Sequence, residues 1–309
     1  MDVSPKLTHF PTNGRCACAR AEGAGRTRPT SYCEAVPRAD DPLTLMCVHA
    51  HPDDEAISTG GILARYSAEG IRTVLVTCTN GELGDAPGGV KPGEPGHTTT
   101  AVVALRRAEL ETSCRALGIS HLELLGYHDS GMMGWPQNDE PDAFWRAEVG
   151  EAASRLAGVM TTYRPQVVVT YDANGFYGHP DHIQAHRVTL AAMDASGIGD
   201  KLYFPAIPVS WLGRFAEVLA SHDVEVPAEV ADVPFGTPDE DIGAVVDCSE
   251  VVGRKYESLA AHASQAENIF FLSFGAELFA ETFAAEAFVR VRDRTGAHGR
   301  EDDLFAGLR

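Results

Sequence analysis

The sequence lacks long apolar runs and an excess of basic residues, and each absence argues against a class of protein. No stretch approaches the roughly 20 apolar residues that a membrane-spanning helix needs. The net charge is −19, which argues against nucleic acid as a partner because nucleic-acid binding requires a basic face. Hydrophobic residues make up 44% and charged residues 22%, as in globular proteins that act in water. We therefore expect a soluble protein that binds neither a membrane nor a nucleic acid.

The seven cysteines form no pattern of disulfides or of zinc ligands. Cys16, Cys18 and Cys33 lie in the first 40 residues at a spacing that matches no zinc motif, although a metal-binding tail is an alternative. The other four lie in or beside apolar runs: Cys47, Cys78, Cys114 and Cys248. Buried free thiols in a reducing, cytoplasmic environment are the simpler interpretation.

The first 40 residues differ from the rest of the chain. They contain proline, glycine and arginine, have no periodic apolar pattern and lack the apolar segment of a signal peptide. We expect residues 1–40 to be a disordered extension and residues 41–309 to form one domain. Within it we expect a Rossmann-like core at about 43–200 and a smaller C-terminal α+β portion at about 201–309.

Apolar runs alternate with amphipathic segments through the expected core. The runs at 43–48, 72–79, 119–125 and 166–171 predict buried strands. The segments at 56–69, 100–117, 141–163 and 183–193 predict helices. This β-α rhythm predicts an α/β fold with a mostly parallel sheet and helices on both faces. Beyond about residue 197 the pattern weakens, with short strands at 201–208 and 244–247 and a helix at 251–263.

A cluster of polar residues follows the first expected strand, in the stretch His51-Pro52-Asp53-Asp54. The end of a strand in a parallel sheet is where ligand sites gather. Adjacent carboxylates repel each other, and one has a raised pKa unless a cation lies between them. A divalent metal bound by His51 and Asp54 would remove the repulsion and leave Asp53 as a base. Alternatively, both acids merely cap the following helix and oppose its dipole.

A second stretch of the same kind favours the metal. Tyr177-Gly178-His179-Pro180-Asp181-His182 also follows an apolar run and opens an expected helix. Three ligands of the His/Asp/His type with one open position are what a catalytic zinc site needs. Such sites also accept Fe²⁺. His186 lies one helical turn after His182 and is a further candidate ligand.

The paired motifs resemble those of the PIG-L/LmbE-like zinc de-N-acetylases. Segments 129–132, 171–175 and 260–265 look like the mycothiol-pathway members of that family, so the resemblance spans roughly residues 43–265. It implies a zinc-dependent hydrolase that removes the N-acetyl group from an N-acetylglucosaminyl substrate, with inositol as the expected acceptor. It also implies a small-molecule acetamido-sugar partner and a Rossmann-like fold.

Roles for individual residues follow from this resemblance. The implied metal ligands are His51, Asp54 and His182, and the implied general base is Asp53. His179 matches a histidine that assists at the tetrahedral centre, Tyr177 matches a tyrosine that polarises the amide carbonyl, and Asp181 matches a carboxylate that orients His179. The family pattern does not use His186 as a ligand.

Substrate contacts are implied at four further positions. Arg106, or its neighbour Arg107, matches an arginine that holds the inositol, and Asp129 and Glu82 lie in loops that match sugar-contacting segments. Ser58 matches the deacetylase, and its segment lacks the lysine typical of the related S-conjugate amidase. The loop 86–99 resembles neither closely and is expected to shape the pocket.

Two alternatives remain at this level. The same chemistry could act on a thiol conjugate or an antibiotic sugar, or the chain could be a non-catalytic sugar-binding protein of the same fold. Among the other histidines, His49, His121 and His128 are expected to be core or supporting residues. His262 is expected either to line the site or to end a helix.

Overall fold

The computed structural model describes residues 42–221 and 236–309. The expected disordered extension and its three cysteines lie outside the described residues. The other four cysteines are buried and free, as expected. No helix within the described ranges is both long and apolar enough to cross a membrane.

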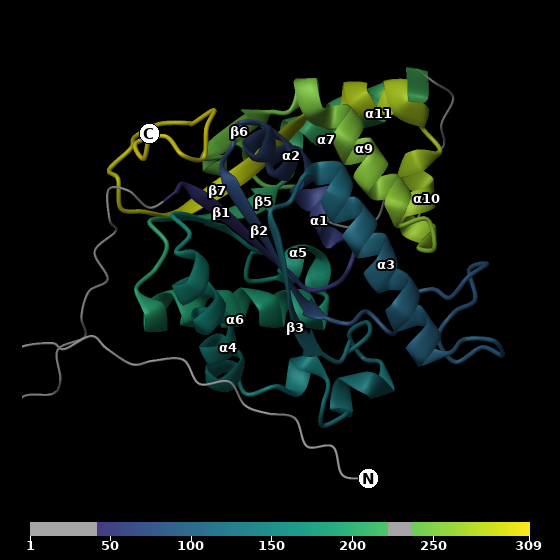
Figure 1. Cartoon of the computed structure of the whole chain (residues 1–309). Helices are drawn as coiled ribbons and strands as arrows, with labels where there is room; N and C mark the ends of the chain where they lie inside the picture. The colour runs from purple at the N-terminus through teal and green to yellow at the C-terminus, as the bar shows by residue number, and fades with distance from the viewer. Residues whose placement is uncertain (1–41, 222–235) are drawn as a thin grey trace, which may run out of the picture. The chain divides into compact units, whose positions relative to one another are not determined.

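A seven-stranded sheet runs through the described part of the chain in the order β3-β2-β1-β4-β5-β7-β6 (Figure 1). Its strands are β1 (Thr44–His49), β2 (Arg72–Thr79), β3 (His121–Tyr127), β4 (Val167–Val169), β5 (Lys201–Ala206), β6 (Ala244–Asp247) and β7 (Ala285–Asp293). The strands from β3 to β5 pair in parallel, whereas β7 is antiparallel to both β5 and β6. The predicted mostly parallel α/β sheet is confirmed, and its C-terminal strands continue the same sheet.

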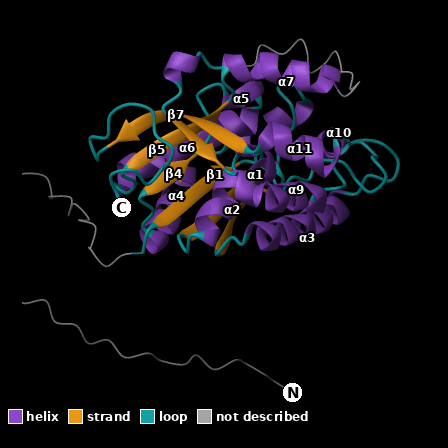
Figure 2. Ribbon diagram, turned by 90° about the horizontal axis from the view of Figure 1, so that it is seen from above, coloured by secondary structure: helices purple, strands orange, loops and turns teal. Residues whose placement is uncertain are grey.

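Helices cover both faces of this sheet (Figure 2). The helices of the described residues are α1 (Asp54–Ser58), α2 (Gly60–Ala68), α3 (Thr99–Leu117), α4 (Val149–Tyr163), α5 (Gly175–Gly178), α6 (Pro180–Ser196), α7 (Val209–Ser221), α9 (Val252–Ala261), α10 (Ala266–Leu272) and α11 (Gly275–Phe283). The helix α7, the helices α10 and α11 and the strand β7 were not predicted from the sequence.

The two-residue period of β1 divides the core into two layers. Leu45 and Cys47 pack with residues of α2 and α3, whereas Met46 and Val48 pack with residues of α4 and α6. All four side chains are fully buried. Because successive strand residues point to opposite faces, one apolar run supplies both layers.

Two predicted helices differ in the structure. The helix expected at 56–69 is interrupted at Thr59, because Glu286 of β7 accepts hydrogen bonds from the backbone N–H groups of Gly61 and Ile62, at 2.7 and 2.9 Å, and so caps a new helix. The helix expected at 141–163 begins only at Val149, where the Glu148 side chain caps it. Both starts depend on side-chain caps, one of which lies more than 200 residues away.

The position of β1 in the sheet determines where the two motifs meet. The chain passes from β1 to β2 and β3 on one side and returns to β4 on the other. At such a reversal the loops after neighbouring strands diverge and leave a crevice at the carboxyl edge. The motif after β1 and the motif after β4 therefore open onto the same place.

A buried ion pair joins β5 to the C-terminal segment and allows a stability test. Lys201 is fully buried, and its ammonium group donates to Glu301 at 2.6 Å. We expect Glu301→Ala to lower the free energy of unfolding by about 3–5 kcal/mol, because it leaves a buried charge without its close partner. Urea denaturation measures this. Glu111→Ala in the exposed Arg107–Glu111 pair is the control and should cost less than about 0.5 kcal/mol; equal losses would refute the prediction.

Candidate metal and catalytic site

The turn after β1 directs two neighbouring carboxylates to different places. Asp53 has φ 123° and ψ −26°, a conformation that costs a non-glycine residue about 1–3 kcal/mol. Asp54 begins α1 and accepts hydrogen bonds from the backbone N–H of His51 and from the Tyr171 hydroxyl, both at 2.7 Å. The unusual backbone at Asp53 thus separates two side chains that are adjacent in sequence.

The second motif begins α6 directly after β4. His179 is the N-cap of this helix, and its Nδ1 accepts the backbone N–H of Asp181 at 3.2 Å. Pro180 occupies the first helical position, where its fixed φ suits the helix. Nδ1 of His182 lies 3.2 Å from the carbonyl oxygen of Gly175, so Nε2 of this ring is left as the acceptor. Gly175 is required there, since a Cβ would lie 2.7 Å from the His182 Cβ.

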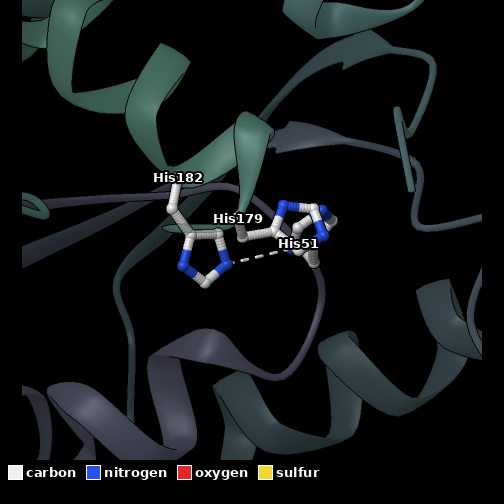
Figure 3. Close-up of side chains that lie close together, drawn as sticks. All are labelled: His51, His179 and His182. Carbon is white, nitrogen blue, oxygen red and sulfur yellow. Dashed lines mark hydrogen bonds between the residues drawn. The ribbon is translucent and has the colours of Figure 1, made fainter. Parts of the chain in front are cut away.

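Three nitrogen and oxygen donors form a nearly equilateral triangle between the two motifs. Nε2 of His182 lies 3.3 Å from Nδ1 of His51 and 3.4 Å from Oδ1 of Asp54, and Nδ1 of His51 lies 3.4 Å from Oδ2 of Asp54. Figure 3 shows the two imidazoles facing each other. Ligands about 2.05 Å from a tetrahedral zinc ion are separated by roughly 3.3 Å. The donor set therefore fits a zinc-sized ion, and it is the set expected from the sequence.

Other donors lie close to this triangle. The ring nitrogens of His51, His179 and His182 include a set within 4.8 Å of one another, and so do donors of His51, Asp129 and Asp181. His51 belongs to every combination. Either set could hold a divalent ion, but the His51–Asp54–His182 triangle has the separations that a tetrahedral site requires.

The two adjacent carboxylates have opposite pKa shifts. Burial alone would raise the pKa of Asp54, but His182 and His51 beside it hold that pKa well below its usual value. Burial raises the pKa of Asp53 to about 6, although Arg106 opposes the increase. Two acids pushed apart in this way are suited to different tasks, a permanent anion and a base that can take up a proton near neutrality.

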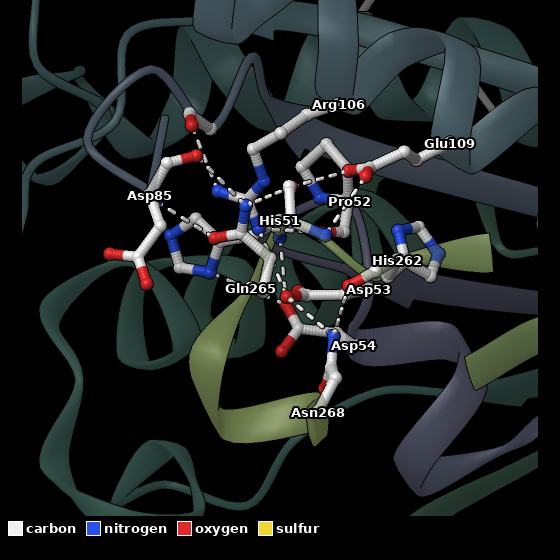
Figure 4. Close-up of polar contacts among 12 residues, drawn as sticks. His51, Pro52, Asp53, Asp54, Asp85, Arg106, Glu109, His262, Gln265 and Asn268 are labelled. Carbon is white, nitrogen blue, oxygen red and sulfur yellow. Dashed lines mark hydrogen bonds and ion pairs between the residues drawn. The ribbon is translucent and has the colours of Figure 1, made fainter. Parts of the chain in front are cut away.

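Asp53 is held outside the donor triangle. Its Oδ2 lies 3.1 Å from the Arg106 guanidinium and 3.5 Å from the Asn268 amide nitrogen (Figure 4). Asn268 follows from α10, far along the chain, and no feature of the sequence pointed to it. The predicted base is therefore positioned by groups that do not touch the donor triangle.

Asp181 supports the opposite side of His51. Its Oδ2 lies 3.2 Å from Nε2 of His51 and accepts the backbone N–H of Ser130 at 2.8 Å. Its Oδ1 accepts the Ser130 hydroxyl. A carboxylate on the far nitrogen of a ligand histidine fixes its ring and tautomer. The resemblance implies that Asp181 orients His179; here its carboxylate contacts His51, and its backbone N–H contacts His179.

His179 and Tyr177 complete the site at its open side. The ring centroids of His179 and His51 lie 4.6 Å apart, and those of Tyr177 and His182 lie 5.1 Å apart. Burial lowers the pKa of His179 to about 2, with His51 and His182 contributing in the same direction. Tyr177 is 42% exposed, so its ring is accessible from solvent. Both residues lie beside the donors, as their expected roles require.

Arg106 is buried and contacts protein groups. Its side chain is 5% exposed and donates to the carbonyl oxygens of Gly81 at 2.8 Å and of Pro52 at 2.5 Å. These bonds tie the first motif to the loop after β2. Arg107 is exposed and pairs with Glu111 at 3.1 Å, which leaves Arg106 as the arginine of the site.

The remaining predicted substrate residues lie in the loops around the donors. Glu82 is buried after β2; its Oε2 accepts the backbone N–H of Asp129 at 3.2 Å, and its Oε1 lies 2.7 Å from Nδ1 of His128. Oδ1 of Asp129 lies 3.7 Å from Nε2 of His51. Ser58 is the partly exposed last residue of α1. Glu82 and Asp129 are thus brought together beside the metal donors.

The other histidines have structural contacts. His49 is fully buried, with Nε2 2.8 Å from the Thr59 hydroxyl. Nδ1 of His186 lies 2.9 Å from the carbonyl oxygen of Tyr171, outside the donor triangle. His262 is fully buried behind the first motif, with Nε2 2.7 Å from Oε1 of Glu55. Sequence analysis left His262 open between two roles and gave Glu55 none.

Comparison with known proteins supports the same chemistry. Residues 46–193 match the model of the family PIG-L, described as GlcNAc-PI de-N-acetylase. A protein of Acidothermus cellulolyticus named 1D-myo-inositol 2-acetamido-2-deoxy-alpha-D-glucopyranoside deacetylase is 43% identical over 277 residues, which cover 86% of this chain and 95% of that protein. A protein of Geodermatophilus obscurus with the same name is 42% identical, covering 85% and 97%.

Solved structures share the fold at lower identity. The N,N'-diacetylchitobiose deacetylase of Pyrococcus horikoshii has a TM-score of 0.52 at 18% identity and covers 82% of this chain and 85% of its own. The 4-carboxy-2-hydroxymuconate hydratase of Pseudomonas putida has a TM-score of 0.55 at 20% identity and covers 83% and 99%. Because a deacetylase and a hydratase share it, the fold alone does not identify the reaction.

The donor triangle predicts where a metal binds. We expect one zinc ion per chain, and we expect His182→Ala and Asp54→Ala each to lower the bound zinc well below one, since each removes one of three donors. Elemental analysis of protein purified with zinc measures the ratio. His186→Ala, which removes a histidine one turn later on the same helix, should keep one ion. Full occupancy in both donor variants would refute the assignment.

Proposed function

The chain belongs to the PIG-L family of de-N-acetylases, and we propose that it is a metal-dependent hydrolase that removes the acetyl group from N-acetylglucosaminyl-inositol in mycothiol biosynthesis. The observation that carries this proposal is the donor triangle at the carboxyl edge of the sheet with Asp53 held beside it. The names of relatives at about 42% identity indicate the acceptor.

His51, Asp54 and His182 would hold the ion, with zinc as the first choice and Fe²⁺ as an alternative for this donor set. When bound there, a divalent ion supplies Lewis acidity toward an amide oxygen and lowers the pKa of a water molecule. The chain's own contribution is the fixed geometry of the donors. His51 is oriented by Asp181, and Asp54 is fixed by the Tyr171 hydroxyl and by the backbone N–H of His51.

Asp53 is the proposed general base. Its pKa of about 6 leaves it mostly ionised at neutral pH but able to accept a proton from water as that water attacks the acetamide carbon. Arg106 and Asn268 hold its carboxylate in one place. A base that is positioned in advance loses little freedom when the reaction occurs.

The negative charge that develops on the acetamide oxygen needs donors, and the leaving amine needs a proton. Tyr177 lies at the open side and can donate its hydroxyl to that oxygen. His179 is neutral, so one of its ring nitrogens carries a proton and can support the same charge. Nδ1 of His179 accepts from the Asp181 backbone, which puts that proton on Nε2. The protonated Asp53 or His179 then supplies the amine as the carbon–nitrogen bond breaks.

Sugar recognition is assigned to the loops after β2 and β3. Glu82 and Asp129 are buried acids whose oxygens can accept hydrogen bonds from sugar hydroxyls, and both lie beside the metal donors. Ser58 and the loop 86–99 are proposed to border the same pocket. Burial raises the pKa of Glu82, and such an acid gains when a sugar hydroxyl replaces lost water.

An acetate-release assay tests the proposed function. Zinc-loaded protein is offered N-acetylglucosaminyl-inositol, free N-acetylglucosamine, N,N'-diacetylchitobiose and an amide of the thiol-conjugate type. We expect kcat/KM to be highest for the inositol glycoside by roughly tenfold or more, because a hydrogen-bonding site discriminates strongly against substrates that lack its partners. Preference for another substrate would redirect the assignment, and release from none would favour the non-catalytic sugar-binding alternative.

Asp53→Ala is the matched control for that assay. It should keep one metal ion per chain and lower kcat by roughly two to four orders of magnitude, as expected for the loss of a general base. Loss of the metal in this variant would mean that Asp53 is a ligand, and its role and that of Asp54 would be exchanged.

Arg106 can be tested by substrate comparison. We expect Arg106→Ala to lower kcat on both the inositol glycoside and free N-acetylglucosamine, because Asp53 loses its ion-pair partner. KM should rise by roughly tenfold for the inositol glycoside alone, as for one hydrogen bond from a charged donor. Arg107→Ala is the exposed control and should change neither constant. Equal changes in KM on both substrates would limit Arg106 to positioning the motif.

A further inference from the structure

A second buried polar cluster lies behind the proposed site and takes no part in the mechanism described above. Its members come from three helices and are all fully buried: Glu55, Ser113, Ser258 and His262. Oε1 of Glu55 lies 2.7 Å from Nε2 of His262 and accepts the Ser113 hydroxyl, which is 2.7 Å from the Ser258 hydroxyl. The cluster thus fixes one carboxylate oxygen of Glu55 through α3 and α9.

The other oxygen of Glu55 reaches the proposed base. Oε2 accepts the backbone N–H of Asp53 at 3.0 Å. This is the residue with φ 123°, a conformation that persists only where surrounding contacts fix it. The carbonyl oxygen of Asp53 accepts from Ala56 at 3.0 Å, so both backbone polar groups of the strained residue are bonded within the same turn.

We propose that Glu55 is a positioning residue for Asp53: anchored by His262 and Ser113, it holds the Asp53 backbone in the conformation that presents the carboxylate as a base. The proposal rests on the proposed function, in which Asp53 takes the proton from water. Glu55 itself touches neither the donor triangle nor the substrate loops. Its effect passes through one hydrogen bond to the backbone.

A simple helix cap is the alternative explanation. In a capping box the third helical residue bonds back to the N-cap N–H and contributes to stability. Glu55 is the second residue of α1, and its carboxylate is anchored by residues 58 and 207 positions along the chain. A cap that only stabilises α1 would change the melting temperature and leave the kinetics of the folded protein unaltered.

Reach and charge can be separated with two substitutions. Glu55→Gln keeps the length of the side chain: its oxygen can accept from Asp53 while its amide faces Ser113 and a His262 tautomer that accepts. Glu55→Asp keeps the charge and is one methylene too short. We expect Glu55→Gln to retain kcat within about threefold and Glu55→Asp to lower it by roughly 10²-fold, as for a displaced catalytic group. KM should change less than about twofold in both, with one metal ion per chain.

Glu286 supplies the matched control. It is another buried carboxylate that caps a helix, through Gly61 and Ile62, and it pairs with Lys255 at 2.7 Å. Glu286→Asp should lower the melting temperature and leave kcat unchanged in the folded protein. If Glu286→Asp lowered kcat as much as Glu55→Asp, general loosening of the protein would explain both, and the proposal would fail.

A second measurement does not depend on activity. Hydrogen exchange of the Asp53 amide, followed by NMR on the full-length protein, should be at least tenfold faster in Glu55→Asp than in Glu55→Gln or the unaltered chain. Should Glu55→Asp not fold, Ser113→Ala removes one of its anchors and should also speed this exchange. Unchanged exchange, or loss of kcat in Glu55→Gln with retention in Glu55→Asp, would overturn the proposal. If the unaltered protein released no acetate, the proposed function would fail, and exchange would still decide the role of Glu55.

Discussion

The parallel pairing of β1 with β4 is the constraint on which the site depends. Leu45, Met46 and Cys47 pair with Val167, Val168 and Val169, and all six side chains are fully buried. A slip of one residue would move one strand end by about 3.3 Å and turn its buried side chains to the other face. The donors of His51 and His182 are only 3.3 Å apart. The apolar register of two short strands therefore sets the geometry of the donor triangle.

A second constraint follows from the sequence of the first motif, in which two carboxylates are adjacent. In a regular helix or strand both would share one environment or point to opposite faces. The positive φ of Asp53 instead puts Asp54 against two histidines and Asp53 against Arg106. The neighbours then move the two pKa values in opposite directions. Strain in one residue thus gives one acid to the metal donors and leaves the other for proton transfer.

The parts that the sequence predicted are those determined by neighbours along the chain. The strand-end motifs and the sheet rhythm are local patterns, so the donors His51, Asp54 and His182 could be named in advance. The burial of Arg106 could not, because its partners are backbone carbonyls of two distant loops. Nor could the break at Thr59, which depends on Glu286. Helical periodicity describes one face of one element, and these features arise from contacts between elements.

The C-terminal part of the chain fixes the loops that surround the site. Gln265 bonds both the backbone N–H and the carbonyl oxygen of Asp85, at 3.0 and 3.2 Å, and so fixes the loop that carries Glu82. Asn268 reaches Asp53. The family model ends at residue 193, before either residue. The matched segment therefore contains the donors and the base, whereas the rigidity of the base and of the sugar loop depends on residues beyond it. A truncation that kept every catalytic side chain would lose the contacts that position them.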